Sequence, residues 1–386
     1  MIVTVTLNPA LDVTYDVDAL VVDATNRVAG MSAHAGGKGV NVARLLRLLD
    51  TAGAAFPGTS ASGSGSGGFG GLGAVARETE VVALGFSGGV TGREFLADLD
   101  RAGIGHAFVA CAGETRRTVA VVDGGAGTVT MLNEPGPVVT PGEWEALRDR
   151  LEGLLPEASV AVLSGSLPPG LPPDAYATLV RLATRHGVPA VLDTGGTALR
   201  LALPAGPEIV KPNAAELAGA LPASAADSAP PWPATSPATG SATSPATGSA
   251  TSPATGSATS PATGSATGHA STARRLPDAG PGDPAGPSDL AGGAAWMRGQ
   301  GARAVVVSDG PRGLYADTPD GRWRAVPPEV VGGNPTGAGD AVVAALALGL
   351  VSGWDWPRAL VQAGHVGDGR AALEDAREES EGTSCR

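Results

Sequence analysis

An acidic residue stands at the start of a long apolar segment near the C-terminal end of the sequence. Asp340 follows the small residues Gly337, Ala338 and Gly339 and precedes a run of Ala, Val and Leu. Backbone N–H groups at a helix N-terminus bind anions, and a nearby carboxylate can accept a proton from a substrate. An acid in the first turn also complements the helix dipole without any further role. The stretch therefore predicts either a catalytic base beside an anion hole or an ordinary helix start.

Three other short stretches have residue types that suit ligand binding. Residues 36–41, GGKGVN, form a tight glycine turn with a cation and an amide at the start of a helix. Residues 164–170, SGSLPPG, place hydroxyl groups and glycine after a strand. Residues 211–213, KPN, precede Glu216; Asn213 can cap the next helix, and Glu216 near a lysine suits hydrated Mg²⁺. Each stretch also has a plain structural interpretation as a loop or a helix cap.

Two common classes of nucleotide-binding loop find no support in the sequence. The pattern G-x-x-x-x-G-K-[ST] occurs nowhere, which excludes a P-loop. Residues 63–68 match G-x-G-x-x-G, but they lie in low-complexity sequence with no strand before them and no helix after them. We therefore give this match no role.

The bulk composition excludes several classes of function. The 386 residues include 26 basic and 38 acidic side chains, a net charge of −12 that repels nucleic acid and anionic lipid. Cys111 and Cys385 lie far apart, and no histidines pair at zinc-binding spacing. The N-terminus lacks a basic leader, and the longest apolar run is shorter than the roughly 20 residues that a membrane span needs. We expect a soluble, cytoplasmic protein.

The elements that must position these stretches follow from the hydrophobic pattern. Apolar runs predict strands at residues 2–7, 81–86, 160–165, 189–194, 208–212 and 303–309. Apolar stripes at helical spacing predict helices that include residues 42–49, 144–154 and 179–183. Buried strands that alternate with amphipathic helices predict an α/β fold, a doubly wound and mostly parallel sheet flanked by helices.

Four other segments alternate apolar and polar residues, as strands with one wet face do. They are residues 13–22, 27–35, 116–123 and 127–133. We interpret the regions 13–35 and 116–133 as a small antiparallel β lid. Ligands of open α/β sheets bind at the carboxyl ends of the strands, where a lid would exclude water.

Some segments have compositions that do not support a packed core. Residues 53–74 are rich in Gly and Ser and predict a flexible loop, and residues 371–386 form a charged tail. Residues 222–288 contain four tandem copies of TSPATGSA, and we expect this insert to be disordered because it has no large side chains to bury. The remainder, residues 1–221 and 289–370, is expected to form a single domain.

The motifs occur in an order that resembles a known family. In sequence they are TLNPALD, GGKGVN, TRRTV, NEPGP, SGSLPPG, KPNAAE, SDGPRG and NPTGAGDA. Together they resemble the ribokinase-like sugar kinases of the phosphofructokinase-B family, most of all its 1-phosphofructokinase and tagatose-6-phosphate kinase branch. The resemblance covers about residues 1–221 and 289–350, excluding the Gly/Ser loop 53–74.

The resemblance implies ATP-dependent phosphorylation of a hexose phosphate, with Mg²⁺. The favoured reaction converts D-fructose 1-phosphate to fructose 1,6-bisphosphate, and tagatose 6-phosphate and fructose 6-phosphate are alternative substrates. A hypothesis of another class is a protein that binds sugar phosphate or nucleotide but has lost turnover. The resemblance also implies a possible homodimer formed through the β lid.

The resemblance implies a role for each matching residue. Asp340 would be the catalytic base, with an anion hole formed by Gly337, Ala338 and Gly339. Sugar-phosphate contacts would come from Asp12, Gly37, Lys38, Asn41 and Arg116. ATP contacts would come from Lys211, Asn213, Ser308, Gly310 and Gly313. Asn213 and Glu216 would hold Mg²⁺, largely through water. The chain departs from the family at residues 365–386, which are charged where relatives continue with an apolar helix that helps to enclose the adenine.

Overall fold

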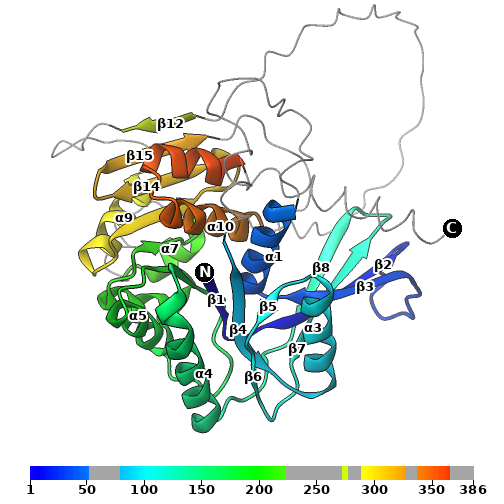
Figure 1. The fold of residues 1–386 in the computed structure, drawn as a ribbon. Helices are drawn as coiled ribbons and strands as arrows, with labels where there is room; N and C mark the ends of the chain where they lie inside the picture. The colour runs from blue at the N-terminus through cyan, green and yellow to red at the C-terminus, as the bar shows by residue number, and fades with distance from the viewer. Residues whose placement is uncertain (52–78, 223–271, 277–287, 327–336, 366–386) are drawn as a thin grey trace, which may run out of the picture.

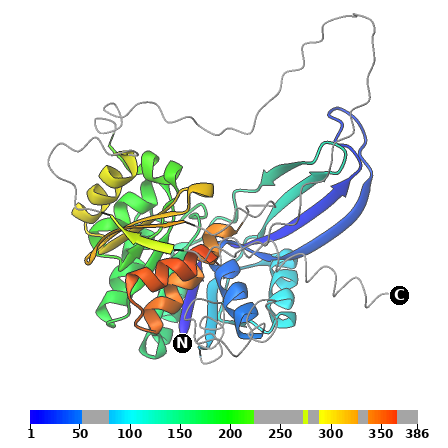
Figure 2. The same cartoon turned by 90° about the horizontal axis from the view of Figure 1, so that it is seen from above.

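Two sheets of unequal size organise the protein (Figures 1 and 2). The structure is a computed structural model that describes residues 1–51, 79–222, 272–276, 288–326 and 337–365. The expected Gly/Ser loop, most of the expected insert and the charged tail lie outside these ranges. The larger sheet has eleven strands and carries helices on both faces, and the smaller sheet of four strands projects from one side of it (Figure 2).

Parallel strands form the centre of the larger sheet. In spatial order they are β13 (Ala304–Ser308), β11 (Ile209–Val210), β10 (Ala190–Asp193), β9 (Val160–Ser164), β1 (Ile2–Thr6), β4 (Val81–Ser87) and β5 (Gly105–His106), and the short β6 (Val109–Ala110) also pairs with β4. All five residues of β1 and of β9 are buried, which explains why these strands read as continuous apolar runs. The predicted doubly wound, mostly parallel sheet is confirmed.

Helices cover both faces of this sheet and divide its core in two. One face carries α1 (Lys38–Thr51), α3 (Gly89–Arg101) and α10 (Ala338–Val351). The other carries α4 (Pro141–Leu154), α5 (Ala175–Arg185), α6 (Gly196–Ala202), α7 (Ala214–Ala220) and α9 (Ser288–Gly299). Neighbouring strand residues alternate between the two cores, because successive side chains point to opposite faces; Ile2 enters the first core and Val3 the second.

Antiparallel strands extend the sheet beyond β13. They are β14 (Leu314–Thr318), β15 (Gly321–Val326) and β12 (Thr272–Arg275). The expectation that the whole insert 222–288 is disordered was wrong for β12, which pairs with β15 along its full length. Ala273 and Leu276 pack against the two cores, but a strand of four residues is too short to leave a periodic signal in the sequence.

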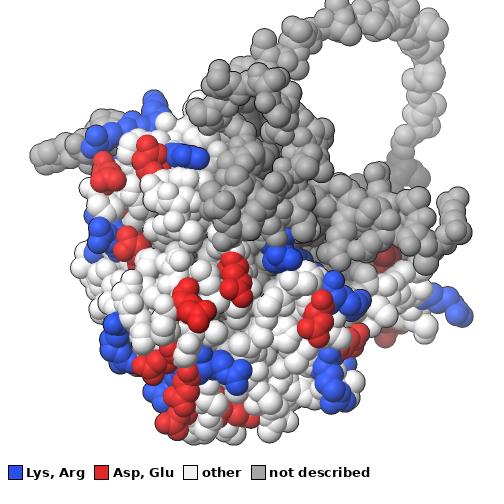
Figure 3. All heavy atoms as spheres, in the orientation of Figure 1, with Lys and Arg blue, Asp and Glu red and all other residues white. Residues whose placement is uncertain are grey.

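A further helix follows α10. It spans residues 356–365, and its Leu360 and Ala363 are buried in the core that also contains α10. The sequence departure at residues 365–386 therefore does not remove the helix after α10. Within the described ranges, no helix has the length and apolar character needed to cross a membrane. On the face drawn in Figure 3, acidic and basic side chains are interspersed.

The smaller sheet corresponds to the predicted lid. Its strands lie in the order β3 (Val28–Gly36), β2 (Ala10–Val17), β7 (Arg116–Asp123) and β8 (Thr128–Asn133). The pairs β2–β3 and β7–β8 are antiparallel, as expected, whereas the central pair β2–β7 is parallel. Alternation of apolar and polar residues gives the same pattern for both orientations, so the sequence did not distinguish them.

Candidate active site

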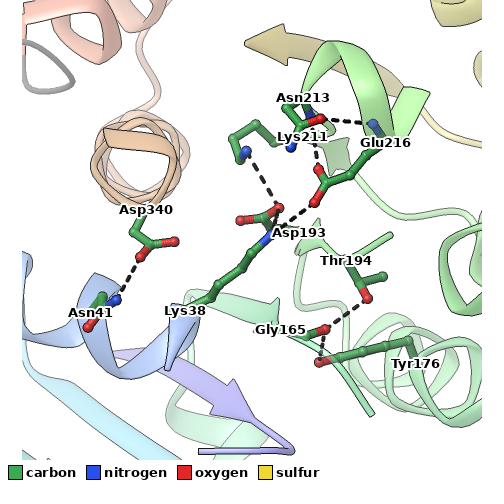
Figure 4. A network of polar contacts seen from close by, with 10 residues as sticks. All are labelled: Lys38, Asn41, Gly165, Tyr176, Asp193, Thr194, Lys211, Asn213, Glu216 and Asp340. Carbon is green, nitrogen blue, oxygen red and sulfur yellow. Dashed lines mark hydrogen bonds and ion pairs between the residues drawn. The ribbon is translucent and has the colours of Figure 1, made fainter. Parts of the chain in front are cut away.

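The stretches singled out in the sequence meet at one edge of the larger sheet. The carboxyl ends of β10, β11 and β13 lie there, together with the first turns of α1, α7 and α10 (Figure 4). Parallel strands end at the same edge of a sheet, so polar residues that follow different strands gather in space. The candidate site is built from this shared edge.

Asp340 lies in the first turn of α10 and is only 5% exposed. Its Oδ2 accepts a hydrogen bond of 2.8 Å from Nδ2 of Asn41, which stands on α1 (Figure 4). Gly337 begins the helix in a left-handed conformation, φ 85°, that favours glycine. Because the next nine residues of α10 are all buried, the carboxylate stands on a rigid support. The hydrogen bond from Asn41 and this support together fix the position of the carboxylate.

Lys211 provides a positive charge beside the same helix start. It is 3% exposed, and its Nζ lies 3.5 Å from Oδ1 of Asp193. A Cβ atom placed on Gly339 would lie 3.3 Å from this Nζ, so the ammonium group adjoins the first turn of α10. An ammonium group and the backbone N–H groups of a helix start can together stabilise negative charge on a phosphoryl group.

Asp193 is a site residue that our sequence interpretation missed. It ends β10 at 1% exposure, and its Oδ1 lies 3.1 Å from Nζ of Lys38 as well as near Lys211 (Figure 4). Its Oδ2 is buried and has no hydrogen-bond partner among the described residues. The available signal was an acid at the carboxyl end of the apolar run 189–194, in a sheet where such ends form the ligand site.

Lys38, which we expect to contact the sugar phosphate, makes ion pairs with two acidic residues of the site. Its Nζ lies 3.1 Å from Asp193 and 3.3 Å from Oε1 of Glu216, on the side of α7 (Figure 4). Burial opposes the charge of Lys38, but Asp193 and Glu216 outweigh it and raise the lysine pKa above its ordinary value. In this arrangement, Lys38 joins α1 to the half of the site that contains Lys211.

A second group of predicted residues lies where the lid meets the sheet. Asp12 on β2 is partly buried, which raises its pKa from 3.8 to about 6; Arg116 opposes this shift and Asp340 adds to it. Burial lowers the pKa of Arg116, whose Nε donates to the Asn8 carbonyl at 3.2 Å. Gly37, left-handed at φ 107°, precedes α1 beside this group. Asp12 and Arg116 thus combine an acceptor and a cation near the candidate base.

The residues expected to bind ATP follow β11 and β13. Asn213 caps α7, and a bridge joins it to Ser308 at the end of β13. Gly310 and Gly313 follow in a short turn with φ values of 53° and 85°. The polar residues at the ends of two adjacent parallel strands therefore lie close together. Lys211 lies between these residues and Asp340.

Asn213 and Glu216 also form a capping box, which bears on their expected role with Mg²⁺. Glu216 Oε2 accepts from the Asn213 N–H at 2.9 Å, its Oε1 contacts Lys38, and Asn213 Oδ1 accepts from the Glu216 N–H at 2.8 Å. Because these oxygens already have partners, the pair suits a hydrated ion better than a directly bound one. Among the described residues, no three His, Cys, Asp or Glu side chains form a metal cluster.

The stretch 164–170 is held by the protein's own hydrogen bonds. The Gly165 carbonyl accepts from the hydroxyl groups of Tyr176, at 3.0 Å, and Thr194, at 2.8 Å (Figure 4). Ser166 accepts from Asn8 Nδ2 at 3.2 Å. These contacts fix the loop after β9 at the edge of the site.

Comparisons with known proteins agree on the family and the fold. The sequence matches the description "pfkB family carbohydrate kinase" over residues 5–229 and 283–368. A tagatose-6-phosphate kinase from Staphylococcus epidermidis is 36% identical over 223 residues, which are 57% of this chain and 62% of that enzyme. The chain therefore spans less than two thirds of that relative's length.

Two solved structures show how far the similarity of fold extends. The tetrameric inhibited form of phosphofructokinase-2 from Escherichia coli matches with a TM-score of 0.69 at 23% identity, covering 98% of this chain and 97% of that one. A possible 1-phosphofructokinase from Thermotoga maritima matches with a TM-score of 0.60 at 23% identity, covering 91% and 85%. At these identities the similarity establishes the fold alone.

Proposed function

Because the chain belongs to the pfkB family of carbohydrate kinases, we propose that it transfers the γ-phosphoryl group of ATP to a hydroxyl group of a hexose phosphate. The observation that carries this proposal is the position of Asp340. This buried carboxylate is hydrogen-bonded to Asn41 and lies in a helix start that begins at Gly337; the same helix start adjoins the ammonium group of Lys211 at Gly339. A base and donors for developing negative charge are therefore available within the same turn.

Each group has a distinct task in the proposed transfer. Asp340 accepts the proton of the sugar hydroxyl, whose oxygen then attacks the γ-phosphorus in line with the leaving group. The N–H groups of Gly337, Ala338 and Gly339, with Lys211, stabilise the negative charge of the transferring phosphoryl group. Fixed donors need no reorganisation during the reaction, so the rigid start of α10 supports this role.

For the acceptor, we propose D-fructose 1-phosphate, which would yield fructose 1,6-bisphosphate. Asp12, Gly37 and Asn41 would contact the sugar, and Arg116 would contact its phosphate because a guanidinium suits bidentate binding of that group. A contact from Lys38 would require it to leave its ion pairs with Asp193 and Glu216. The 36% identical tagatose-6-phosphate kinase favours tagatose 6-phosphate as a second candidate.

The proposed reaction requires ATP, and Mg²⁺ would neutralise charge on its phosphates. Lys211, Asn213, Ser308, Gly310 and Gly313 would bind the nucleotide, because they surround the ends of β11 and β13. Asn213 and Glu216 would hold the ion through water, as their capping contacts permit.

An assay of ADP release with fructose 1-phosphate, tagatose 6-phosphate and fructose 6-phosphate tests the proposal. Asp340→Asn should lower kcat about 10²–10⁴-fold with little effect on the dissociation constant of the sugar phosphate. Asp320→Asn changes an exposed acid in the turn between β14 and β15 and should leave both values unchanged. Binding without turnover on all three sugars would favour the alternative of a sugar-phosphate-binding protein.

We further propose a homodimer formed through the lid. Apolar side chains are exposed on its two outer strands, with Met31 on β3 and Val129, Met131 and Leu132 on β8 each at least 46% exposed. A second copy would cover them, and exposed apolar groups of this kind often mark interfaces. Met31→Glu should shift the protein to a monomer in size-exclusion chromatography with light scattering. A monomeric unchanged protein would contradict the proposal.

A further inference from the structure

A short turn after β13 is held by an unusual set of charges. The backbone of residues 308–313 closes on itself: the Asp309 N–H donates to the Gly313 carbonyl at 2.9 Å, and the Gly313 N–H donates to the Gly310 carbonyl at 3.0 Å. The Ser308 N–H donates to the Pro212 carbonyl at 3.1 Å, which ties the turn to the residues after β11. The turn therefore has a defined shape beside Lys211 and Asn213.

Asp309 is the charged centre of this turn. Its side chain is 2% exposed and contacts two arginines, with Oδ1 at 2.7 Å from Arg312 and Oδ2 at 3.1 Å from Arg324. Arg324 also donates to the Arg312 carbonyl at 3.0 Å. A buried carboxylate is costly unless it is paired, so the three side chains hold one another in a narrow range of positions.

Arg324 connects the turn to the outer strands of the sheet. It stands on β15, opposite Arg274 of β12, and is itself largely buried. β12 follows the repeat segment, and the Leu276 N–H donates to the Arg322 carbonyl at 2.8 Å just beyond it. The support for the turn thus extends from Asp309 through Arg324 to a strand supplied by the insert.

We propose that Asp309 is a positioning residue for nucleotide binding, acting through the turn 308–313 and held in place by Arg324. The inference rests on the proposed function, which assigns Ser308, Gly310 and Gly313 to ATP. Asp309 itself is 2% exposed and faces the two arginines, so it acts through the backbone of the turn. It fixes the backbone of the glycines that would contact the nucleotide, so its loss affects ATP and leaves the sugar phosphate unaffected.

The chain offers a matched control on the neighbouring strand. Asp317 of β14 is also buried and pairs with an arginine, Arg298, at 2.6 Å. It is opposite Val305, near the amino end of β13, whereas the turn follows the carboxyl end at Ser308. Asp317→Asn therefore removes a similar buried charge at a distance from the turn.

The test compares Asp309→Asn, Arg324→Gln, the double variant and Asp317→Asn. We expect Asp309→Asn to raise the KM for ATP, and the dissociation constant of Mg²⁺-ATP measured by calorimetry, about tenfold, the scale of one charged hydrogen bond. The KM for the sugar phosphate should stay within about twofold of the value for the unchanged protein. The KM for ATP of the double variant should be no higher than that of the single variant with the higher KM. Asp317→Asn should leave both KM values unchanged.

Either of two results would overturn the inference: ATP affinity that stays within about twofold in both Asp309→Asn and Arg324→Gln, or equal losses for ATP and sugar phosphate. Equal losses would indicate a general destabilisation of the fold. If Asp309→Asn does not fold, Arg324→Gln still tests the ion pair by removing the charge of the arginine. Calorimetry with ATP requires no turnover, so absence of activity on hexose phosphates would refute the proposed function separately.

Discussion

At neutral pH, the folded protein should be less stable with Asp12 than with an uncharged residue at this position. Its pKa is raised from 3.8 to about 6 because burial disfavours the carboxylate, although Arg116 partly offsets this. Below pH 3.8 the group is protonated in both states and adds no penalty. As pH rises to about 6, the unfolded chain releases the proton while the folded chain retains it, so stability falls.

The size of this penalty follows from the pKa shift. A shift of about two units corresponds to about 3 kcal/mol, fully developed above pH 6 and about half developed at pH 5. Asp12→Asn removes the titration. The variant should therefore unfold with a free energy about 3 kcal/mol higher than that of the unchanged protein at pH 8, and about 1.5 kcal/mol higher at pH 5.

Urea denaturation followed by tryptophan fluorescence at pH 5 and pH 8 measures the two differences. Asp16→Asn provides a matched control, because Asp16 is an exposed acid on the same strand, and it should change stability by less than about 0.5 kcal/mol. The reasoning is refuted if the advantage of Asp12→Asn does not grow between pH 5 and pH 8, or if this variant is the less stable protein at pH 8. The same substitution should weaken sugar-phosphate binding, since stability and function compete at this position.

Three further predictions follow from the site and the outer strands. The KM for the sugar phosphate should rise as pH falls below about 6, where Asp12 gains a proton; a flat profile from pH 5 to 8 would contradict its role. Asp193→Asn should lower the free energy of unfolding by about 3–5 kcal/mol, because Lys211 loses a buried partner. The control Glu152→Gln, at an exposed ion pair with Arg185, should lower it by less than about 0.5 kcal/mol in the same urea titration. Deleting repeats 235–266 should leave Tm unchanged, whereas Arg274→Pro should lower it by disturbing the β12–β15 pairing; equal Tm values would show that this pairing contributes nothing.

The central sheet could be predicted because its strands are buried on both faces. The run 160–165 is apolar almost throughout, and in the structure every residue of β9 is buried. The positions of the candidate ligand stretches were also predictable, because each follows such a strand or opens a helix. Strands that are buried on both faces have continuous apolar sequences, so for these strands the hydrophobic pattern predicts the fold directly.

The pairings between distant segments could not be predicted in this way. Lys38 and Asp193 are 155 positions apart, and nothing local to either residue shows that they will meet. The orientation of β2 against β7 and the return of β12 to the sheet edge are also decided by tertiary contacts. Sequence motifs identified most of the candidate site residues but not Asp193, whereas the partners of these residues depended on the fold.

The structure also shows that the two halves of the site share one support. Lys38 and Asn41 stand one turn apart at the start of α1, yet Lys38 contacts Asp193 and Glu216 while Asn41 contacts Asp340. A shift of α1 would therefore move the partner of the proposed base and the ion pairs on the proposed nucleotide side together. In a kinase the acceptor hydroxyl and the phosphoryl group must be aligned with each other, and a single helix that contacts both sides restricts their relative positions.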